Sequence, residues 1–375
     1  MPPCITPDFK NDNLRRTHHP CRQRKHREPL ETQILLRQSE EIMTTRLIQI
    51  QQGSVRQVGL IDEPKIRLLA EFASIYELAN AAINKGMKLS ALVRQCLTDE
   101  SLDYDDVYAG ASEWRILPAV DHPEEPARCL VTGTGLTHTA SAKNRNAMHA
   151  ESGGLTDSIR MFQSGLEGGR PEDGKIGVAP EWFYKGCGMV LRAHGEPLIV
   201  PTYAEDGGEE PEVAGVYLIG PDAQPYRIGF TIGNEFSDHQ FEQRNYLYLA
   251  GSKLRNCAVG PELVIDHKFE SVPGVVTIER DGHTLWSHEI KTGDAEMCHS
   301  LRNIEHHHFK FAGHRRPGDV HVHFFGADAF SFGAGVWLND GDVMNVRFEG
   351  FGRALSNPVR MDRASDVVVA VTTLT

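Results

Sequence analysis

Carboxylate side chains gather beside two short apolar runs in the middle of this sequence. Glu210 and Glu212 directly precede an apolar run at 213–219, and Glu235 follows a second run at 226–232. In an extended segment Glu210 and Glu212 point to the same face, because side chains alternate with a period of two. Three converging carboxylates repel one another unless a hard divalent cation such as Mg²⁺ or Mn²⁺ relieves the repulsion. The pattern is therefore typical either of an oxygen-ligated metal site or of a solvated acidic loop, and spacing alone favours the loop.

Histidines supply a second set of potential metal ligands, at His306–His308, His314, His321 and His323. The last two are expected on one face of a strand. No second pair of ligands follows with a spacing typical of zinc sites, and unpaired histidine runs are common in loops, so we favour a structural role. The Gly133-x-Gly135 step is too short for a dinucleotide fingerprint, and we expect no nucleotide cofactor.

Short apolar runs separated by turn signals would position these side chains. Thirty-five glycines and twenty prolines indicate many turns, which favours a strand-rich body over a helical bundle. Turn signals include Gly220-Pro-Asp222 and Asp281-Gly282. The runs expected to form strands lie at 129–131, 188–191, 213–219, 226–232, 275–279, 320–325 and 343–348.

The segment before these runs predicts a small domain of its own. Residues 47–58 alternate apolar and polar side chains around a glycine, which predicts a hairpin. Helical spacing follows at 75–82 and 91–97, with Ser90 as the expected N-cap of the second helix. An acidic joint that contains proline occupies 121–126. We therefore place a small N-terminal domain at 43–125 and a large domain at 126–375.

Residues 1–42 differ in composition from the rest of the chain. Six Lys and Arg residues lie between Arg15 and Arg27, with no acidic residue among them. This composition is typical of a disordered basic tail, and a nucleic-acid-binding arm or a targeting peptide is the alternative. Met43 directly precedes the first strand-like segment.

Composition excludes several classes of protein. The chain has 375 residues, a formal net charge of -12 and 40% hydrophobic residues, which is globular usage rather than disorder. The negative charge argues against a general nucleic-acid binder, and no apolar run approaches the roughly 20 residues of a membrane span. Seven scattered cysteines without a Cys-x-x-Cys pair suggest neither a disulfide framework nor a thiolate zinc site. We expect a reduced, cytoplasmic protein without a signal peptide.

An ordered set of motifs resembles the fumarylacetoacetate hydrolase superfamily. The set covers about 128–360, and because its pieces occur in the order of the family, the resemblance favours a metal site over an acidic loop. Its pieces are Pro-Glu-Trp-Phe-Tyr-Lys at 180–185, Glu-Pro-Glu at 210–212, Gly-Phe-Thr-Ile-Gly-Asn-Glu at 229–235, Gly-Ser-Lys at 251–253, Gly-Pro at 260–261, Leu-Asn-Asp-Gly-Asp at 338–342 and Phe-Glu-Gly-Phe-Gly at 348–352.

The resemblance implies a fold, a cofactor and a set of site residues. It implies an α+β protein with a mixed β-sandwich roll as catalytic domain, usually a homodimer, that acts on small-molecule 2-oxo acids. Lys253 would lie at the substrate, where a desolvated amine beside a cation could move a C3 proton, with Lys185 nearby. The implied Mg²⁺ or Mn²⁺ ligands are Glu210, Glu212 and Glu235, and the implied substrate-binding residues are Gly135, Thr137, His138, Lys185 and Asn234.

One departure from the family pattern changes the expected reaction. Family hydrolases carry a His–Glu dyad that activates water, whereas the matching positions here hold Ser141 and Asn144, and His138 lies three residues early. Further departures are Glu235 in place of Asp and Gly326-Ala327 in place of Gly-Thr. A site with the metal and lysine but no water-activating dyad can still enolise a 2-oxo acid and expel a C4 hydroxyl, which Ser141 could hydrogen-bond.

The chain therefore resembles the dehydratase branch of the superfamily. We expect a metal-dependent hydro-lyase that converts 2-keto-3-deoxy-L-arabinonate to 2,5-dioxopentanoate through a metal-stabilised enolate. The alternatives are a C–C bond hydrolase of 2,4-diketo acids that releases pyruvate, and a non-catalytic protein that binds 2-oxo acids. We expect neither nucleic acid nor membrane as partner.

Overall fold

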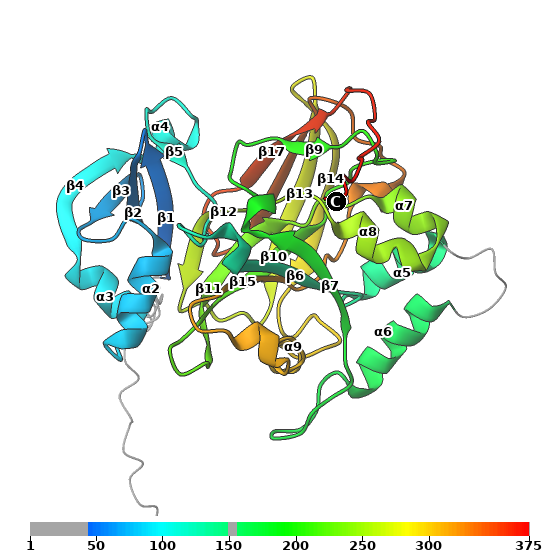
Figure 1. Cartoon of the computed structure of the whole chain (residues 1–375), viewed down its shortest axis with the longest axis horizontal. Helices are drawn as coiled ribbons and strands as arrows, with labels where there is room; N and C mark the ends of the chain where they lie inside the picture. Colours follow the sequence, from blue (N-terminus) through cyan, green and yellow to red (C-terminus); the bar gives the residue numbers. More distant parts are fainter. Residues whose placement is uncertain (1–43, 149–155, 375) are drawn as a thin grey trace, which may run out of the picture. The chain divides into compact units, whose positions relative to one another are not determined.

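The computed structural model describes residues 44–148 and 156–374, with side chains omitted at 144–148 (Figure 1). Residues 44–375 form one compact unit. The basic tail predicted at 1–42 lies outside the described residues. Within the described part, no helix has both the length and the apolar character needed to cross a membrane.

The first strands and helices follow the sequence closely. The predicted hairpin is confirmed, because β1 and β2 pair antiparallel across Gly53. Helix α2 is capped by Ser74, whose hydroxyl accepts the Glu77 N–H at 3.1 Å. The predicted Ser90 cap is wrong: α3 begins at Leu89, two residues before the predicted start at 91, and Ser90 is buried in its first turn. These elements are β1 (Thr45–Gln52), β2 (Val55–Asp62), β3 (Lys65–Leu69), α2 (Ile75–Asn84), α3 (Leu89–Gln95), β4 (Leu97–Asp103), α4 (Tyr104–Tyr108) and β5 (Arg115–Ile116).

Two sheets form the body of the protein. The larger has the order β4-β3-β2-β1-β12-β11-β10-β15-β6-β7, with β5 on β1 and β8 on β12. The smaller has the order β14-β13-β16-β17-β9. Its members and those of the larger sheet after β5 are β6 (Cys129–Gly135), β7 (Glu181–Cys187), β8 (Leu191–Arg192), β9 (Leu198–Val200), β10 (Pro211–Ile219), β11 (Pro225–Asn234), β12 (Cys257–Ile265), β13 (Val272–Arg280), β14 (His283–Thr292), β15 (Val320–Phe324), β16 (Val343–Phe348) and β17 (Leu355–Met361).

The larger sheet runs through both domains predicted from sequence. Strand β1 pairs antiparallel with β12, with Thr45 opposite Ile265 and Leu47 opposite Leu263. The hydrogen-bonded ladder therefore continues across the boundary predicted at 125/126, and the division into two domains stays a prediction.

Apolar alternation along the central strands builds a core on each face of the larger sheet. In β10, Ala214, Val216 and Leu218 pack in the cluster that includes α2 and α3 residues. Val213 faces the other way, into the cluster shared with β13, β16 and β17 of the smaller sheet. All nine residues of β10 are buried, as expected of a strand covered on both faces. The predicted α+β fold with two facing sheets is confirmed.

One predicted strand is wrong. Residues 188–191 form a short 3₁₀ turn (Gly188–Val190) followed by the two-residue β8, while the neighbouring segment Glu181–Cys187 is the strand β7. Gly188 passes so close to the chain that a Cβ there would lie 3.0 Å from both Cys129 Cβ and the Pro126 carbonyl oxygen. This close approach bends the chain out of the sheet after β7.

The remaining elements are short helices, of which α8 lies against the edge strand β7 of the larger sheet. Helix α8 packs against both α7 and β7 (Figure 1). These helices are α5 (Thr139–Met148), α6 (Asp157–Gly168), α7 (His239–Arg244), α8 (Leu249–Lys253) and α9 (Leu301–Phe309), with short 3₁₀ turns at Pro126–Arg128, Tyr246–Tyr248, Ala312–Arg315 and Ser331–Ala334.

Candidate metal and substrate site

Two adjacent strands bring the three predicted metal ligands together. Glu212 of β10 lies opposite Gly233 of β11, and the Glu235 N–H donates to the Glu210 carbonyl at 2.9 Å. All three carboxyl groups are buried, and one oxygen from each lies within 4.8 Å of the others. The strand pairing thus converts a separation of more than twenty residues into one group of oxygen ligands.

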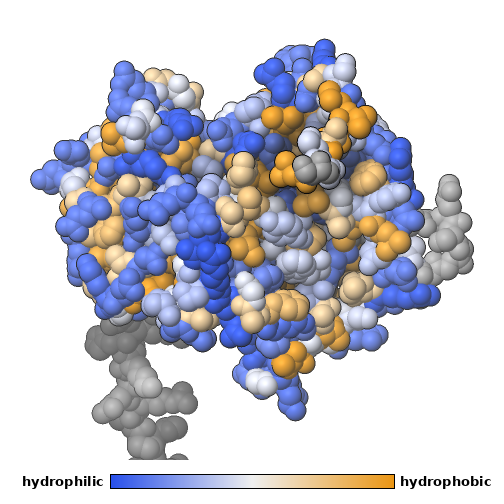
Figure 2. Space-filling model, viewed as in Figure 1, coloured by the Kyte–Doolittle hydropathy of each residue, from blue (hydrophilic) through white to orange (hydrophobic). Residues whose placement is uncertain are grey.

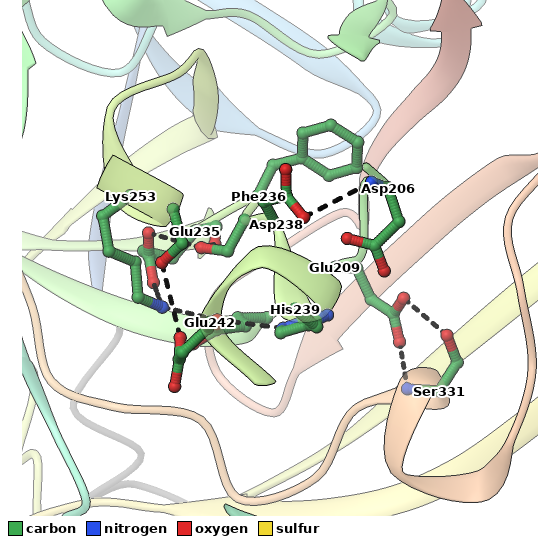
Figure 3. A network of polar contacts seen from close by, with 12 residues as sticks. Asp206, Glu209, Glu235, Phe236, Asp238, His239, Glu242, Lys253 and Ser331 are labelled. Carbon is green, nitrogen blue, oxygen red and sulfur yellow. Dashed lines mark hydrogen bonds and ion pairs between the residues drawn. The ribbon is translucent and has the colours of Figure 1, made fainter. Parts of the chain in front are cut away.

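Two buried lysines neutralise part of this negative charge. The Lys253 ammonium, at the end of α8, lies 2.5 Å from Glu210 Oε1 and 2.6 Å from Glu235 Oε2 (Figure 3). Lys185 of β7 lies 2.6 Å from Glu235 Oε1 and also donates to the Phe236 carbonyl. The ring of Phe183 lies 4.9 Å from the Lys253 nitrogen. The predicted catalytic lysines therefore contact the predicted metal ligands directly.

Glu212 differs from its neighbours because it has no cationic partner in the part of the chain that the structure describes. Its Oε2 accepts only the Gly326 N–H, at 2.6 Å. Burial, with the charges of Glu235 and Glu210, raises the pKa of Glu212 well above its usual range. The Lys253 charge opposes this rise without forming an ion pair with Glu212, and a divalent cation bound by the three carboxylates would favour the ionised form of Glu212.

The other charged groups shift in directions set by their contacts. Burial would raise the pKa of Glu210, but the Lys253 ammonium and the His239 hydrogen bond hold it well below its usual range. Burial raises the pKa of Glu235 against the opposing effect of both lysines. Burial also lowers the pKa of Lys185, although Glu235 opposes that shift. Glu210 is thus held ionised and ready to bind a cation.

The sequence did not predict that the loop carrying Ser331 contacts the acidic segment 209–212. Glu209, which is fully buried, accepts the Ser331 N–H at 2.6 Å and its hydroxyl at 2.7 Å (Figure 3). His239 Nε2 lies 3.1 Å from Glu210 Oε1. His239 follows Glu235 by four residues, but no local pattern predicts the turn between β11 and α7 that folds its side chain back.

A small cavity lies beside the carboxylates and contains the residue that replaces a dyad member. Ser141 and Glu210 both line it, so the predicted catalytic serine and a predicted metal ligand share one cavity. The Ser141 hydroxyl donates to the His138 carbonyl at 3.0 Å. The residues that line the cavity are Gly135, Leu136, Ser141, Glu210, Gly326, Ala327 and Phe330.

The other predicted substrate residues have structural contacts next to this cavity. The Thr137 hydroxyl donates to the Phe325 carbonyl at 2.7 Å and contacts His138 Nδ1 at 2.8 Å. Burial lowers the pKa of His138 to about 4, and its Nε2 has no hydrogen-bond partner in the described part of the chain. Asn234 accepts the Glu210 N–H at 3.3 Å and thereby supports the ligand segment. Asn144 lies in α5, where its backbone alone is described.

The histidine group of the sequence is a separate hydrogen-bonded cluster. Trp182 Nε1 donates to His308 Nδ1 at 3.2 Å, and His308 Nε2 lies 2.9 Å from His321 Nδ1. His323 contacts two threonine hydroxyls, those of Thr132 and Thr134, at 2.8 and 2.7 Å. These contacts give five of the six ring nitrogens of His308, His321 and His323 a partner, and His321 Nε2 has none among the described residues.

Comparison with solved structures shows that the fold of this chain is shared with known enzymes. A structure of 2-keto-3-deoxy-D-arabinonate dehydratase with magnesium and 2,5-dioxopentanoate matches with a TM-score of 0.63 at 19% identity, over 85% of this chain and 100% of that one. A 2-hydroxyhepta-2,4-diene-1,7-dioate isomerase from Mycobacterium marinum matches with a TM-score of 0.53 at 17% identity, over 85% and 100% of the two chains. No protein-family model matches the sequence.

Curated relatives point to the predicted branch. A probable 2-keto-3-deoxyxylonate dehydratase of Haloferax volcanii is 29% identical over 185 residues, 48% of this chain and 60% of the relative. A 2-dehydro-3-deoxy-D-arabinonate dehydratase of Saccharolobus solfataricus is 31% identical over 120 residues, 31% of this chain and 39% of the relative. The alignments thus span less than two thirds of either relative. The names of both relatives confirm the resemblance to sugar-acid dehydratases that the motifs predicted.

Proposed function

We propose that this chain is a Mg²⁺-dependent dehydratase of 2-keto-3-deoxy pentonic acids. The observation that carries the proposal is the convergence of three buried glutamates and Lys253, one of the glutamates, Glu210, lining a cavity with Ser141. The names of the curated relatives support the same reaction class.

Glu210, Glu212 and Glu235 would hold the metal ion. Carboxylate oxygens are the ligands that Mg²⁺ prefers, and Glu212, which forms no ion pair with the described residues, has an oxygen within 4.8 Å of those of Glu210 and Glu235. Bound Mg²⁺ would polarise the 2-oxo group of the substrate as a Lewis acid. A magnesium-containing structure of a protein with the same fold supports this cofactor.

The residues of the chain would carry the proton transfers. Lys253, a buried side chain beside the ligands, would take the C3 proton in its neutral amine form, once a metal ion had replaced it as the partner of Glu210 and Glu235. The electrons of the C3–H bond form the C3–C4 double bond, and the C4 hydroxyl leaves with a proton as water. Loss of a C5 proton and protonation of C3 would then give the C4–C5 enol, which tautomerises to the aldehyde of 2,5-dioxopentanoate. Ser141 would hydrogen-bond this hydroxyl. Lys185 would fix Glu235 in place through its 2.6 Å contact.

Absence of a water-activating pair at the expected positions favours dehydration over C–C hydrolysis. Ser141 donates to a backbone carbonyl and is not a general base at neutral pH. The lowered pKa of His138, about 4, leaves it neutral, and Thr137 occupies its Nδ1. The hydrolase stays the runner-up, with His138 as the replacement base.

The configuration at C4 has two candidates. The sequence interpretation favours the acid derived from L-arabinonate, whereas the printed name of one curated relative specifies D-arabinonate. Both acids give the same achiral product, 2,5-dioxopentanoate, so product analysis cannot separate them and each enantiomer must be supplied alone.

The test is an assay of the purified protein with Mg²⁺ and each enantiomer of 2-keto-3-deoxyarabinonate, with and without EDTA. EDTA-sensitive formation of 2,5-dioxopentanoate without pyruvate is the expected result. Glu212→Gln should abolish it, and Glu289→Gln, which changes an exposed acid in β14, should not. Pyruvate from a 2,4-diketo acid without dehydration would make the chain a hydrolase. Binding of Mg²⁺ and a 2-oxo acid without turnover would make it a binding protein.

A homodimer stays part of the proposal. Exposed apolar residues lie next to α8, with Tyr246, Leu247 and Tyr248 at 37%, 78% and 46% of their full accessibility. Hydrophobic residues also form separate groups between hydrophilic ones on the face in Figure 2. A second copy could cover such residues, and light scattering coupled to size-exclusion chromatography would give the oligomeric state.

A further inference from the structure

His239 contacts the metal-ligand group, although no sequence motif predicts it as a site residue. It is the first residue of α7 and is buried, and its Nε2 lies 3.1 Å from Glu210 Oε1. Figure 3 shows His239 beside the coil of α7. Glycine is required beside it, because a Cβ at Gly208 would lie 2.3 Å from His239 Nδ1.

Two aromatic rings fix the orientation of the His239 imidazole. Phe330 stacks on it with ring centroids 4.7 Å apart and an interplanar angle of 11°. The Phe332 ring lies 5.0 Å away at 36°. Phe330 also lines the cavity beside Glu210. One ring thus forms the wall of the cavity and supports the side chain that holds a ligand.

The loop that carries these rings also grips the neighbouring acids. Gly326 donates its N–H to Glu212 Oε2 at 2.6 Å, and Ser331 donates twice to Glu209. Through His239 the loop reaches Glu210 as well. The loop therefore contacts each acidic residue of the segment 209–212, directly or through one imidazole.

The two carboxylate oxygens of Glu210 have different hydrogen-bond contacts. Oε1 accepts from both Lys253 and His239, at 2.5 and 3.1 Å. Oε2 accepts no hydrogen bond from the residues that the structure describes. A carboxylate held through one oxygen by two donors presents the other to a cation in a fixed direction.

We propose that His239 is a positioning residue for the metal ion: it holds Glu210 through Oε1 and directs Oε2 to the cation. This inference rests on the proposed metal site. Partners that orient metal ligands are typically worth about 10–100-fold in metal affinity. His239 touches neither the metal nor the substrate in this arrangement, so its effect should appear in metal binding itself.

The experiment measures metal affinity without turnover. Mn²⁺ is titrated into the EDTA-treated full-length protein, with free Mn²⁺ followed by electron paramagnetic resonance, and Mg²⁺ binding is measured by calorimetry. His239→Phe removes the hydrogen bond and should weaken both ions about 10–100-fold. His239→Gln can keep a donor toward Glu210 and should recover part of the loss. The matched control is His323→Gln, which changes a buried histidine that bonds Thr132 and Thr134 instead.

The outcomes separate this inference from the proposed function. No Mn²⁺ binding by the wild type would overturn the proposed metal site and this inference together. If the wild type binds Mn²⁺ and the affinity of His239→Phe is within twofold of the wild-type affinity, the inference alone is overturned. An equal loss of affinity in His323→Gln would overturn it as well. If His239→Phe does not fold by circular dichroism, Phe332→Leu removes one supporting ring outside the cavity. That variant should bind the metal several-fold more weakly, and unchanged binding would again overturn the inference.

Discussion

Replacing Lys253 with methionine separates the two effects of this lysine, on stability and on chemistry. Its side chain is 1% exposed and lies within 2.6 Å of both Glu210 and Glu235, whose side chains are 9% and 0% exposed. Methionine fills a similar volume without the charge. The metal-free variant would therefore bury carboxylates that have lost a cationic partner.

The expected magnitude follows from this burial. Removing one partner of a buried ion pair typically costs about 3–5 kcal/mol of the free energy of unfolding. Mg²⁺ at 100 times its dissociation constant stabilises a protein by about 2.7 kcal/mol. In Lys253→Met the ion should bind more tightly than in wild type, because no ammonium competes for Glu210 and Glu235. Turnover should fall about 10²–10⁴-fold, the range of a lost general base.

Urea denaturation with EDTA or Mg²⁺, calorimetry and the dehydration assay measure these quantities. Lys291→Met is the matched control: its ion pair with Glu296 is 2.7 Å long, but the two side chains are 52% and 27% exposed. That pair should be worth about 1 kcal/mol or less. A metal-free Lys253→Met as stable as wild type, with no gain in Mg²⁺ affinity, would refute the reasoning from burial and competition.

Three further predictions concern pH and backbone geometry. Because the pKa of Glu212 is raised well above its usual range by burial and by Glu235, Mg²⁺ binding should release a proton and strengthen as pH rises through that pKa. Calorimetry in two buffers should detect this release in wild type and not in Glu212→Gln. Burial lowers the pKa of His321 to about 3, so at acidic pH above that value the unfolded chain binds a proton at this residue and the folded chain does not. Stability should therefore fall as pH drops from about 6.5 toward 3, and a urea series should show a smaller fall in His321→Gln. Gly326 has φ 95°, and a Cβ there would lie 2.1 Å from Thr137 Oγ1. Gly326→Ala should lose about 1–3 kcal/mol of stability together with Mg²⁺ affinity, and unchanged values of both by denaturation and calorimetry would contradict this.

The local elements of the fold were legible in the sequence because they depend on short-range alternation. The run predicted at 343–348 is β16 residue for residue, and 213–219 is the apolar part of β10. Two local predictions failed. Ser90 is not an N-cap because α3 begins at Leu89, and residues 188–191 do not form the predicted strand, at a point where Gly188 lies close to Cys129.

For the candidate site as well, the sequence predicted some features and the structure added others. Motif order predicted Glu210, Glu212, Glu235 and both lysines as site residues, and period-two alternation predicted that Glu210 and Glu212 point to one side. One carboxylate oxygen of each of the three glutamates lies within 4.8 Å of the others. The structure adds that Lys253 and Lys185 touch the carboxylates and that Ser141 shares a cavity with Glu210.

By itself the sequence determined the residue types that could bind a cation and the strands that carry them. Only the tertiary structure decided which side chains meet them: Ser331 grips Glu209 across 122 residues, and His239 turns back to Glu210 across 29. Strand β15 also pairs with β6 across more than 180 residues, which brings Gly326 to Glu212. Such contacts depend on the packing of whole sheets and loops, and side-chain periodicity within a segment carries no information about them.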